Sequence, residues 1–155
     1  MPIGNLSDYL DRLNVKYETI THPATYTAQE IAAAAHIPGK NLAKTVMVRV
    51  DGDLAMAVLP ASYMVDFELL RAVTGANSVE LASEDDFDLL FAEYETGAMP
   101  PFGHLFGLDV YVARSLAEDE EIAFNAGSHT ELIKMSYDDF ARLARPKVMK
   151  FSRKH

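Results

Sequence analysis

The strongest constraint on the fold is a short turn sequence between two β-prone segments near the middle of the chain. Residues 43–50 and 54–59 consist mainly of Ala, Val, Leu and Met, and residues 51–53 read Asp-Gly-Asp. An Asp-Gly pair between apolar runs is a strong signal for a β-hairpin, because glycine readily adopts the positive φ that a tight turn requires. The sequence therefore predicts an antiparallel hairpin whose strands are largely buried.

Further helices and strands are predicted on both sides of this hairpin. Apolar residues recur with helical spacing from Leu6 to Leu13, and Asp66 and Gly75 are placed to cap the two ends of a helix. The predicted helices span residues 6–13, 27–35, 67–73, 83–91 and 136–143, and the other predicted strands span residues 15–20, 79–81, 108–113, 122–125 and 132–135. This irregular order predicts a single α+β domain with a curved, mixed, barrel-like β-sheet and flanking helices. We assign residues 1–148 to this domain and residues 149–155 to a basic C-terminal tail.

Several classes of protein are excluded by what the sequence lacks. It contains no cysteine, which excludes disulfides, thiolate zinc sites and a cysteine nucleophile. Its histidines lack HxH and HExxH spacing, so we expect no metal and no cofactor. No GxGxxG or GxxxxGK[ST] sequence follows a predicted strand, which argues against dinucleotide-binding and P-loop folds. We expect a soluble, cytoplasmic protein without a membrane partner, because no signal peptide and no apolar run of roughly 18–20 residues is found.

The charge is unevenly distributed along the chain. The net charge is −9, yet residues 142–155 contain six basic side chains and no acidic one. An acidic protein is not expected to bind nucleic acid over a broad surface. The basic end has two interpretations: a solvated, partly frayed terminus, or an arm that contacts phosphates and makes binding sensitive to salt.

Lys44 is the first candidate for a functional side chain. It lies at the start of the predicted strand 43–50, where a lysine must either reach solvent or find an anionic or carbonyl partner. Its compact ammonium can hold a carbonyl, an oxyanion or a ribose hydroxyl. The alternative is an ordinary lysine at the end of a strand.

Two glycine-containing segments are further candidates. Residues 97–103 read Gly-Ala-Met-Pro-Pro-Phe-Gly, in which glycine lets a ligand approach the backbone and proline fixes the loop before binding. Residues 125–130 read Asn-Ala-Gly-Ser-His-Thr and follow an apolar strand, so their turn can expose backbone donors to a cleft. For both segments the alternative is a turn with a purely structural role.

Taken together and in this order, these segments resemble the YbaK/ProX family of aminoacyl-tRNA deacylases, which is related to the insertion domain of bacterial prolyl-tRNA synthetases. The match runs from about residue 5 to residue 148, and its motifs are Thr21-His22-Pro23, Lys44-Thr45-Val46, residues 97–103 and residues 122–127. The resemblance implies a curved mixed sheet and hydrolysis, in trans, of the ester between a wrong amino acid and the tRNA 3′ end. It places the essential lysine at Lys44. The substrate-binding residues that it implies are His22, Thr45, Gly97, Ala98, Met99, Pro100, Pro101, Gly127, Ser128 and His129.

The chemistry is compatible with the residues present. An aminoacyl ester is already activated, so the enzyme need only position water and stabilise an oxyanion, with no metal. The small residues near the expected pocket favour small amino acids of the Ala, Ser, Thr, Pro or Cys class. The expected partners are mischarged tRNA and, as a further candidate, an aminoacyl-tRNA synthetase. Two alternatives remain: a non-catalytic module that binds aminoacyl-tRNA or a synthetase, and a small-molecule hydrolase that uses Ser128 and His129.

Overall fold

The predicted hairpin forms the centre of the largest sheet in the computed structural model, which describes residues 6–22, 30, 32–33, 37–92, 94, 98–128 and 130–154. β2 (Ala43–Val50) and β3 (Asp53–Pro60) pair antiparallel along their whole length. Both turn residues have positive φ, 51° at Asp51 and 88° at Gly52. The Asp51 carboxylate also accepts backbone N–H groups of Asn77 and Ser78 at 2.8 and 3.0 Å. These bonds tie the turn to the residues just before the strand 79–81.

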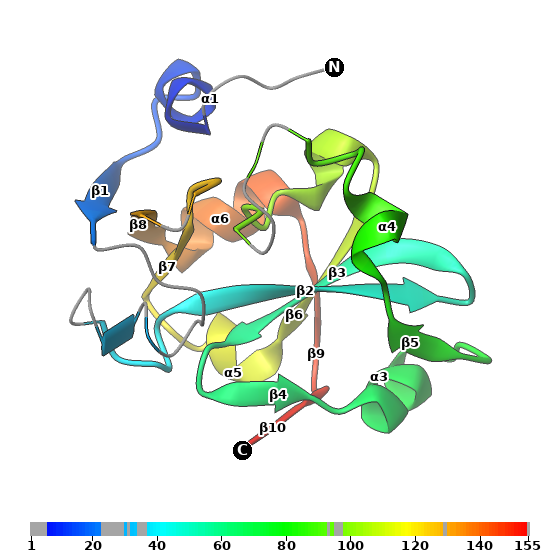
Figure 1. Ribbon diagram of the computed structural model, residues 1–155. Helices are drawn as coiled ribbons and strands as arrows, with labels where there is room; N and C mark the ends of the chain where they lie inside the picture. The colour runs from blue at the N-terminus through cyan, green and yellow to red at the C-terminus, as the bar shows by residue number, and fades with distance from the viewer. Residues whose placement is uncertain are drawn as a thin grey trace.

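The strands form three sheets (Figure 1). The five-stranded sheet has the order β5 (Val79–Leu81), β2, β3, β6 (Asp109–Ala113) and β9 (Lys147–Met149), with β6 and β9 running parallel to β3. The antiparallel three-stranded sheet has the order β1 (Tyr17–Thr21), β8 (Glu131–Ser136) and β7 (Glu121–Asn125). The two-stranded sheet consists of β4 (Tyr63–Val65) and β10 (Ser152–Lys154).

Short helices surround these sheets. They are α1 (Leu6–Arg12), α3 (Phe67–Thr74), α4 (Glu84–Phe87), α5 (Arg114–Ala117), α6 (Tyr137–Ala144) and the 3-10 helix η1 (Gly103–Phe106). α3 begins as expected, because the Asp66 carboxylate accepts the Leu69 N–H at 3.0 Å, and it ends at Gly75, whose φ is 73°. α4 is shorter than predicted. Leu89, which the predicted helix included, lies beyond its end and is 93% exposed.

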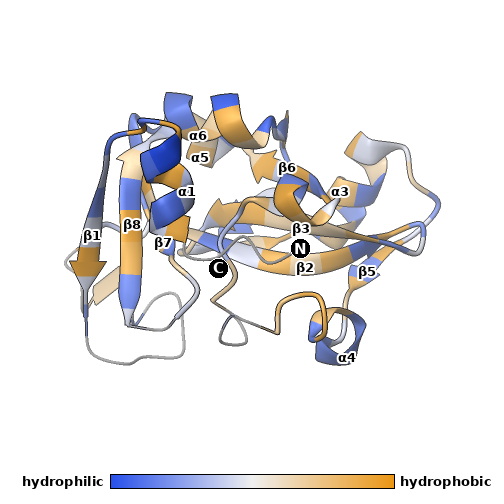
Figure 2. Cartoon of the chain, turned by 90° about the horizontal axis from the view of Figure 1, so that it is seen from above, coloured by the Kyte–Doolittle hydropathy of each residue, from blue (hydrophilic) through white to orange (hydrophobic). Residues whose placement is uncertain are grey.

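Hydrophobic residues pack on both faces of the hairpin, and six of the eight residues of β3 are buried; Figure 2 colours the chain by hydropathy. The upper core, toward α6 in Figure 1, includes Met56, Val58, Phe102, Phe124 and Phe140. The lower core, toward α3 and β4, includes Val48, Leu59, Leu70, Tyr111 and Phe151. A third group, the junction cluster, joins the three-stranded sheet to the hairpin and consists of Ala32, Leu42, Ala61, Ala123 and Leu132.

The prediction of one α+β domain with mixed strand directions and flanking helices is confirmed. The strands, however, are divided among three sheets, and within the described residues the five-stranded sheet ends at β5 and β9 without closing. The predicted helix over residues 27–35 falls largely outside the described residues. No helix in the described part of the chain is long and apolar enough to cross a bilayer.

The basic C-terminal residues are part of the fold, so the expectation of a frayed end is wrong. β9 pairs with β6, β10 pairs with β4, and Phe151 between them is fully buried in the lower core. The Phe151 carbonyl also accepts the Asp66 N–H at 2.7 Å. Residue 148 therefore lies within a strand and does not separate a folded domain from a loose tail.

Candidate active site

Lys44 lies near the start of β2, on the face of the hairpin that carries the lower core and the junction cluster. Successive side chains of a strand point to opposite faces. Ala43 and Met47 belong to the upper core and Val48 belongs to the lower core, so Lys44 shares the face of Val48. Leu42, two residues before Lys44, lies on this face in the junction cluster.

Strand β7 reaches the start of β2 through a single parallel β-bridge between Leu42 and Ala123. The Ala123 N–H donates to the Asn41 carbonyl at 2.9 Å, and both bridge residues belong to the junction cluster. Because the bridge is parallel, the two strands continue from it in the same direction. Lys44 and Asn125 each follow the bridge by two residues, and both therefore lie on the face of the junction cluster.

Strand β1 brings His22 to the same face. Ile20 pairs with Leu132 and packs against the junction cluster, and His22 follows Ile20 by two residues. The His22 N–H donates to the Thr130 carbonyl at 2.9 Å, which continues the β1–β8 ladder, and its side chain is only 5% exposed. We refer to Lys44, His22 and Asn125 as the candidate site.

The predicted turn after β7 contacts the predicted glycine–proline loop through the backbone. Gly127 has a φ of 98°, and its N–H donates to the Ala98 carbonyl at 3.0 Å. A Cβ atom at position 127 would lie 2.5 Å from the Cδ1 atom of Tyr94. Glycine is therefore required at this position both by the backbone angle and by the aromatic ring beside it.

Replacing Gly127 by alanine is expected to destabilise the protein more than the same change at Gly52. Both residues have positive φ, but a Cβ at Gly52 would meet no atom within 4 Å, whereas one at Gly127 would meet Tyr94. The difference in unfolding free energy should be about 1–3 kcal/mol, the usual cost of overpacking. Urea denaturation of the two variants measures it. Equal losses would show that the Tyr94 ring moves aside without cost.

Ser128 forms its hydrogen bonds within the turn. Its Oγ lies 3.2 Å from Thr130 Oγ1 and accepts the Thr130 N–H at 3.4 Å. These contacts fix the shape of the turn beside β8. His129, the proposed partner of Ser128 in a small-molecule hydrolase, lies outside the described residues.

The remaining residues named from the sequence are distributed over both faces of the sheet. Residues 98–101 are all buried, and the Met99 side chain packs in the upper core. Thr45 pairs with Val58 of the upper core and so faces away from Lys44. Gly97 lies outside the described residues. The loop therefore meets the turn through the Ala98 carbonyl, and a single pocket shared with Lys44 remains a prediction.

The Lys44 ammonium is half-buried and makes one hydrogen bond with the described residues, to the Ala61 carbonyl at 3.3 Å. Burial lowers the pKa of Lys44 below the usual lysine value of 10.5. An ammonium has three N–H donors, so two of them are not used by the described residues. A cation in this position can bind a carbonyl oxygen or an oxyanion with little screening by water.

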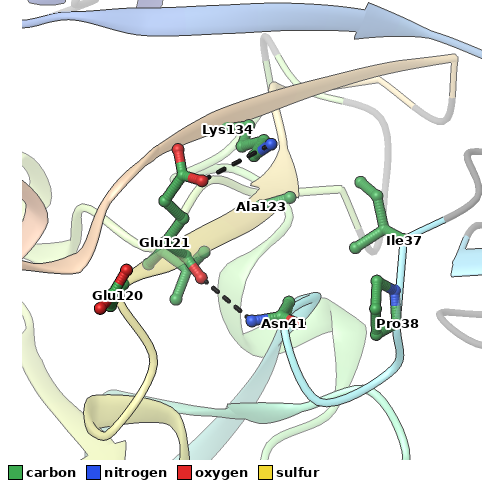
Figure 3. Close-up of a pocket in the computed structure, with 8 residues that line it drawn as sticks. Ile37, Pro38, Asn41, Glu120, Glu121, Ala123 and Lys134 are labelled. Carbon is green, nitrogen blue, oxygen red and sulfur yellow. Dashed lines mark hydrogen bonds and ion pairs between the residues drawn. The ribbon is translucent and has the colours of Figure 1, made fainter.

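Two of the cavities among the described residues are well defined, and neither is lined by Lys44. The larger, of about 320 Å³, extends from Ala123 toward the start of β7, with Ile37 and Pro38 across from Glu120 and Glu121 (Figure 3). Its two carboxylates make it unsuited to phosphate, although Lys134 forms an ion pair of 3.6 Å with Glu121. The smaller cavity, of about 210 Å³, is lined by Phe87, Asp88, Phe91, Ala92, Tyr94 and Met99. Within the described residues, no three His, Asp or Glu side chains are grouped as a metal site requires.

Asn125 is a candidate residue that the sequence patterns did not single out. It lies in a segment that they did select, but an asparagine at the end of a strand is common in turns and carries no catalytic signature. Asn125 becomes a candidate because the Leu42–Ala123 bridge brings β7 to the start of β2, although the two strands are far apart in the chain.

Comparison with known proteins assigns the chain to a family. The model of the aminoacyl-tRNA editing domain matches residues 22–143, a range that contains all three residues of the candidate site. The chain belongs to the aminoacyl-tRNA editing domain family. This result confirms the resemblance seen in the sequence motifs.

Individual proteins are similar to most or to part of the chain. The multifunctional Ser/Thr-tRNA deacylase ProXp-y of Escherichia coli (strain K12) is 29% identical over 152 residues, covering 93% of this chain and 89% of the relative. A proline–tRNA ligase of Staphylococcus saprophyticus is 31% identical over 67 residues, covering 43% of this chain and 12% of the ligase.

Solved structures share the fold at low sequence identity. The hypothetical protein APE2540 superposes with a TM-score of 0.84 at 19% identity, covering 96% of this chain and 99% of its own. A candidate trans-editing enzyme for prolyl tRNA synthetase superposes with a TM-score of 0.81 at 18% identity, covering 96% of this chain and 94% of its own.

Proposed function

We propose that this editing domain is a trans-acting deacylase, which hydrolyses the ester between a wrong, small amino acid and the 3′ end of tRNA in the cytoplasm. The observation that carries the proposal is the half-buried Lys44 ammonium. It has one described hydrogen bond and lies on one face with His22 and Asn125, inside the segment matched by the editing-domain model. A cation that is only partly satisfied at the start of a strand is suited to a ligand with a carbonyl or an anionic oxygen.

Hydrolysis of an aminoacyl ester passes through a tetrahedral intermediate whose former carbonyl oxygen carries negative charge. Lys44 is proposed to hold this oxygen, or the adjacent ribose, through charge and hydrogen bonds. The attacking water needs a base. We assign this role to the substrate: the 2′-hydroxyl of the terminal ribose takes the proton of the attacking water and passes its own proton to the 3′-oxygen, which leaves as a hydroxyl when the ester bond breaks.

The proposed substrates are tRNAs charged with small amino acids: Ser and Thr first, and Ala, Pro and Cys as further members of the class. The Ser/Thr-tRNA deacylase relative supports this choice. The net negative charge of the protein is compatible with tRNA binding if the protein contacts only the 3′ end, because few phosphates then lie near it. An aminoacyl-tRNA synthetase is a further proposed partner, since a proline–tRNA ligase contains a related segment.

A panel of mischarged tRNAs tests the function. The full-length protein should release Ser or Thr from tRNA far faster than the spontaneous rate, and should release bulky aromatic amino acids much more slowly. If it binds these tRNAs without accelerating the hydrolysis of any of them, the chain is a binding module and the deacylase proposal is rejected.

A further inference from the structure

Asn125 carries a buried hydrogen-bond acceptor that has no partner among the residues that the structure describes. It is the last residue of β7, opposite Leu132 in β8. Its side-chain Oδ1 is inaccessible to solvent and accepts no hydrogen bond from the described residues. Buried acceptors are nearly always bonded, because an unmade bond costs the full desolvation of the group. A ligand toward which the Asn125 side chain turned would supply the missing donor.

The position of Asn125 connects this acceptor to Lys44. Asn125 shares the face of Ala123 and Leu132, which pack with Leu42 in the junction cluster. The parallel bridge between Leu42 and Ala123 joins β7 to the start of β2, and Asn125 and Lys44 each lie two residues beyond it on the face of the junction cluster. A substrate held by Lys44 would therefore present its neighbouring groups to Asn125.

We propose that Asn125 is a specificity-determining residue, whose amide oxygen accepts the side-chain hydroxyl of a seryl or threonyl group. This inference rests on the deacylase function proposed above. The α-ammonium of the substrate is a poorer donor here, because the Lys44 ammonium would repel it. A ribose hydroxyl is the other available donor, but every aminoacyl-tRNA carries it, so the two possibilities predict different selectivity.

A site that accepts a hydrogen bond from the substrate hydroxyl separates seryl from alanyl substrates more strongly than an apolar pocket does. A pocket that lacks a polar partner separates substrates by one methyl group only weakly, whereas a site that hydrogen-bonds a substrate hydroxyl disfavours the analogue without it, because its own polar group is then left unpaired. Asn125 would thus disfavour alanyl-tRNA relative to seryl-tRNA.

The test is the ratio of kcat/KM for seryl-tRNA to kcat/KM for alanyl-tRNA on the same tRNA. In Asn125→Ala this ratio should fall about tenfold or more. Asn125→Asp, which keeps an acceptor in place, should retain the preference for the seryl group. Asn41→Ala is the matched control, because the Asn41 amide donates to the Glu121 carbonyl near the other end of β7, and its ratio should not change.

The outcomes separate this inference from the proposed function. If the parent protein hydrolyses neither substrate, the deacylase proposal fails. If it hydrolyses both and Asn125→Ala slows them equally, Asn125 contacts a group common to all substrates and the specificity proposal is overturned. The affinities of the parent protein for two non-hydrolysable analogues provide a second test. An amide-linked 3′-seryl-adenosine should bind about tenfold more tightly than its alanyl counterpart. Equal affinities would also overturn the proposal.

Discussion

Replacing Lys44 by alanine should lower kcat/KM for deacylation at least about a hundredfold while leaving the fold intact. The ammonium is half-buried, so negative charge developing beside it is poorly screened by water. By analogy with the loss of an oxyanion-hole donor, the cost is about 3–4 kcal/mol of transition-state stabilisation, and each 1.36 kcal/mol corresponds to a tenfold change in rate. Single-turnover hydrolysis of seryl-tRNA measures the effect, and thermal unfolding checks the fold.

Two further variants make this test specific. Lys40→Ala removes the same charge from an exposed position shortly before β2 and should change kcat/KM little. Lys44→Arg should recover little activity, because a planar guanidinium does not occupy the place of a compact ammonium. If folded Lys44→Ala protein deacylates seryl-tRNA at the parental rate, Lys44 is an ordinary strand-end lysine and the mechanism proposed above is wrong.

The pH dependence of deacylation provides a second test, in which the parent protein is compared with Lys44→Ala. Burial disfavours the charged form of Lys44 and lowers its pKa, so the ammonium is present at low pH and is lost as pH rises through a value below 10.5. Enzyme-catalysed deacylation, corrected for spontaneous hydrolysis, should therefore fall on the alkaline side earlier than an exposed lysine would allow. The residual activity of Lys44→Ala should lack this alkaline decline.

The sequence predicted those parts of the fold that depend on local signals. The hairpin was placed correctly to within a residue, because the Asp-Gly turn and its apolar flanks determine both strands without help from the rest of the chain. α3 was placed equally well from its two caps. By contrast, β4, β9 and β10 have three residues each, and the last reads Ser-Arg-Lys. Such strands form because their backbone pairs with a strand distant in the chain, β9 with β6 and β10 with β4, and their side chains give no periodic signal.

The candidate site was predictable only as a set of separate segments. Lys44 and the turn at Gly127 have local signatures, namely a cation at the start of an apolar strand and a glycine that follows another. Their arrangement depends on the Leu42–Ala123 bridge, which no local pattern encodes. The orientation of each side chain follows from the alternation of β2, and for this reason Thr45, chosen with Lys44, faces the opposite core.

Replacing Phe151 by alanine should lower the free energy of unfolding by about 3–5 kcal/mol, the usual loss for a buried phenylalanine. Phe151 is fully buried in the lower core, and its carbonyl accepts the N–H of Asp66, the residue that caps α3. Because the total stability of a domain is only about 5–15 kcal/mol, the C-terminal segment is structural. Removing residues 149–155 would therefore unfold the end of the chain as well as remove charge. Urea denaturation of Phe151→Ala measures the loss, and a change below about 1 kcal/mol would contradict the packing described here.

The double variant Arg153→Gln/Lys154→Gln is the matched control, since it removes two exposed charges of β10 and leaves Phe151 and the β4–β10 pairing in place. Its stability should change by no more than about 0.5 kcal/mol. The same variant tests the remaining interpretation of the basic segment, in which its side chains contact phosphates. If these side chains bind phosphates of tRNA, KM should rise, and the slope of log KM against log salt should flatten by about 0.7–0.9 for each phosphate that is no longer neutralised. An unchanged slope would show that the C-terminal strands stabilise the lower core without binding tRNA, so that recognition of the substrate would depend on the region of Lys44 and Asn125.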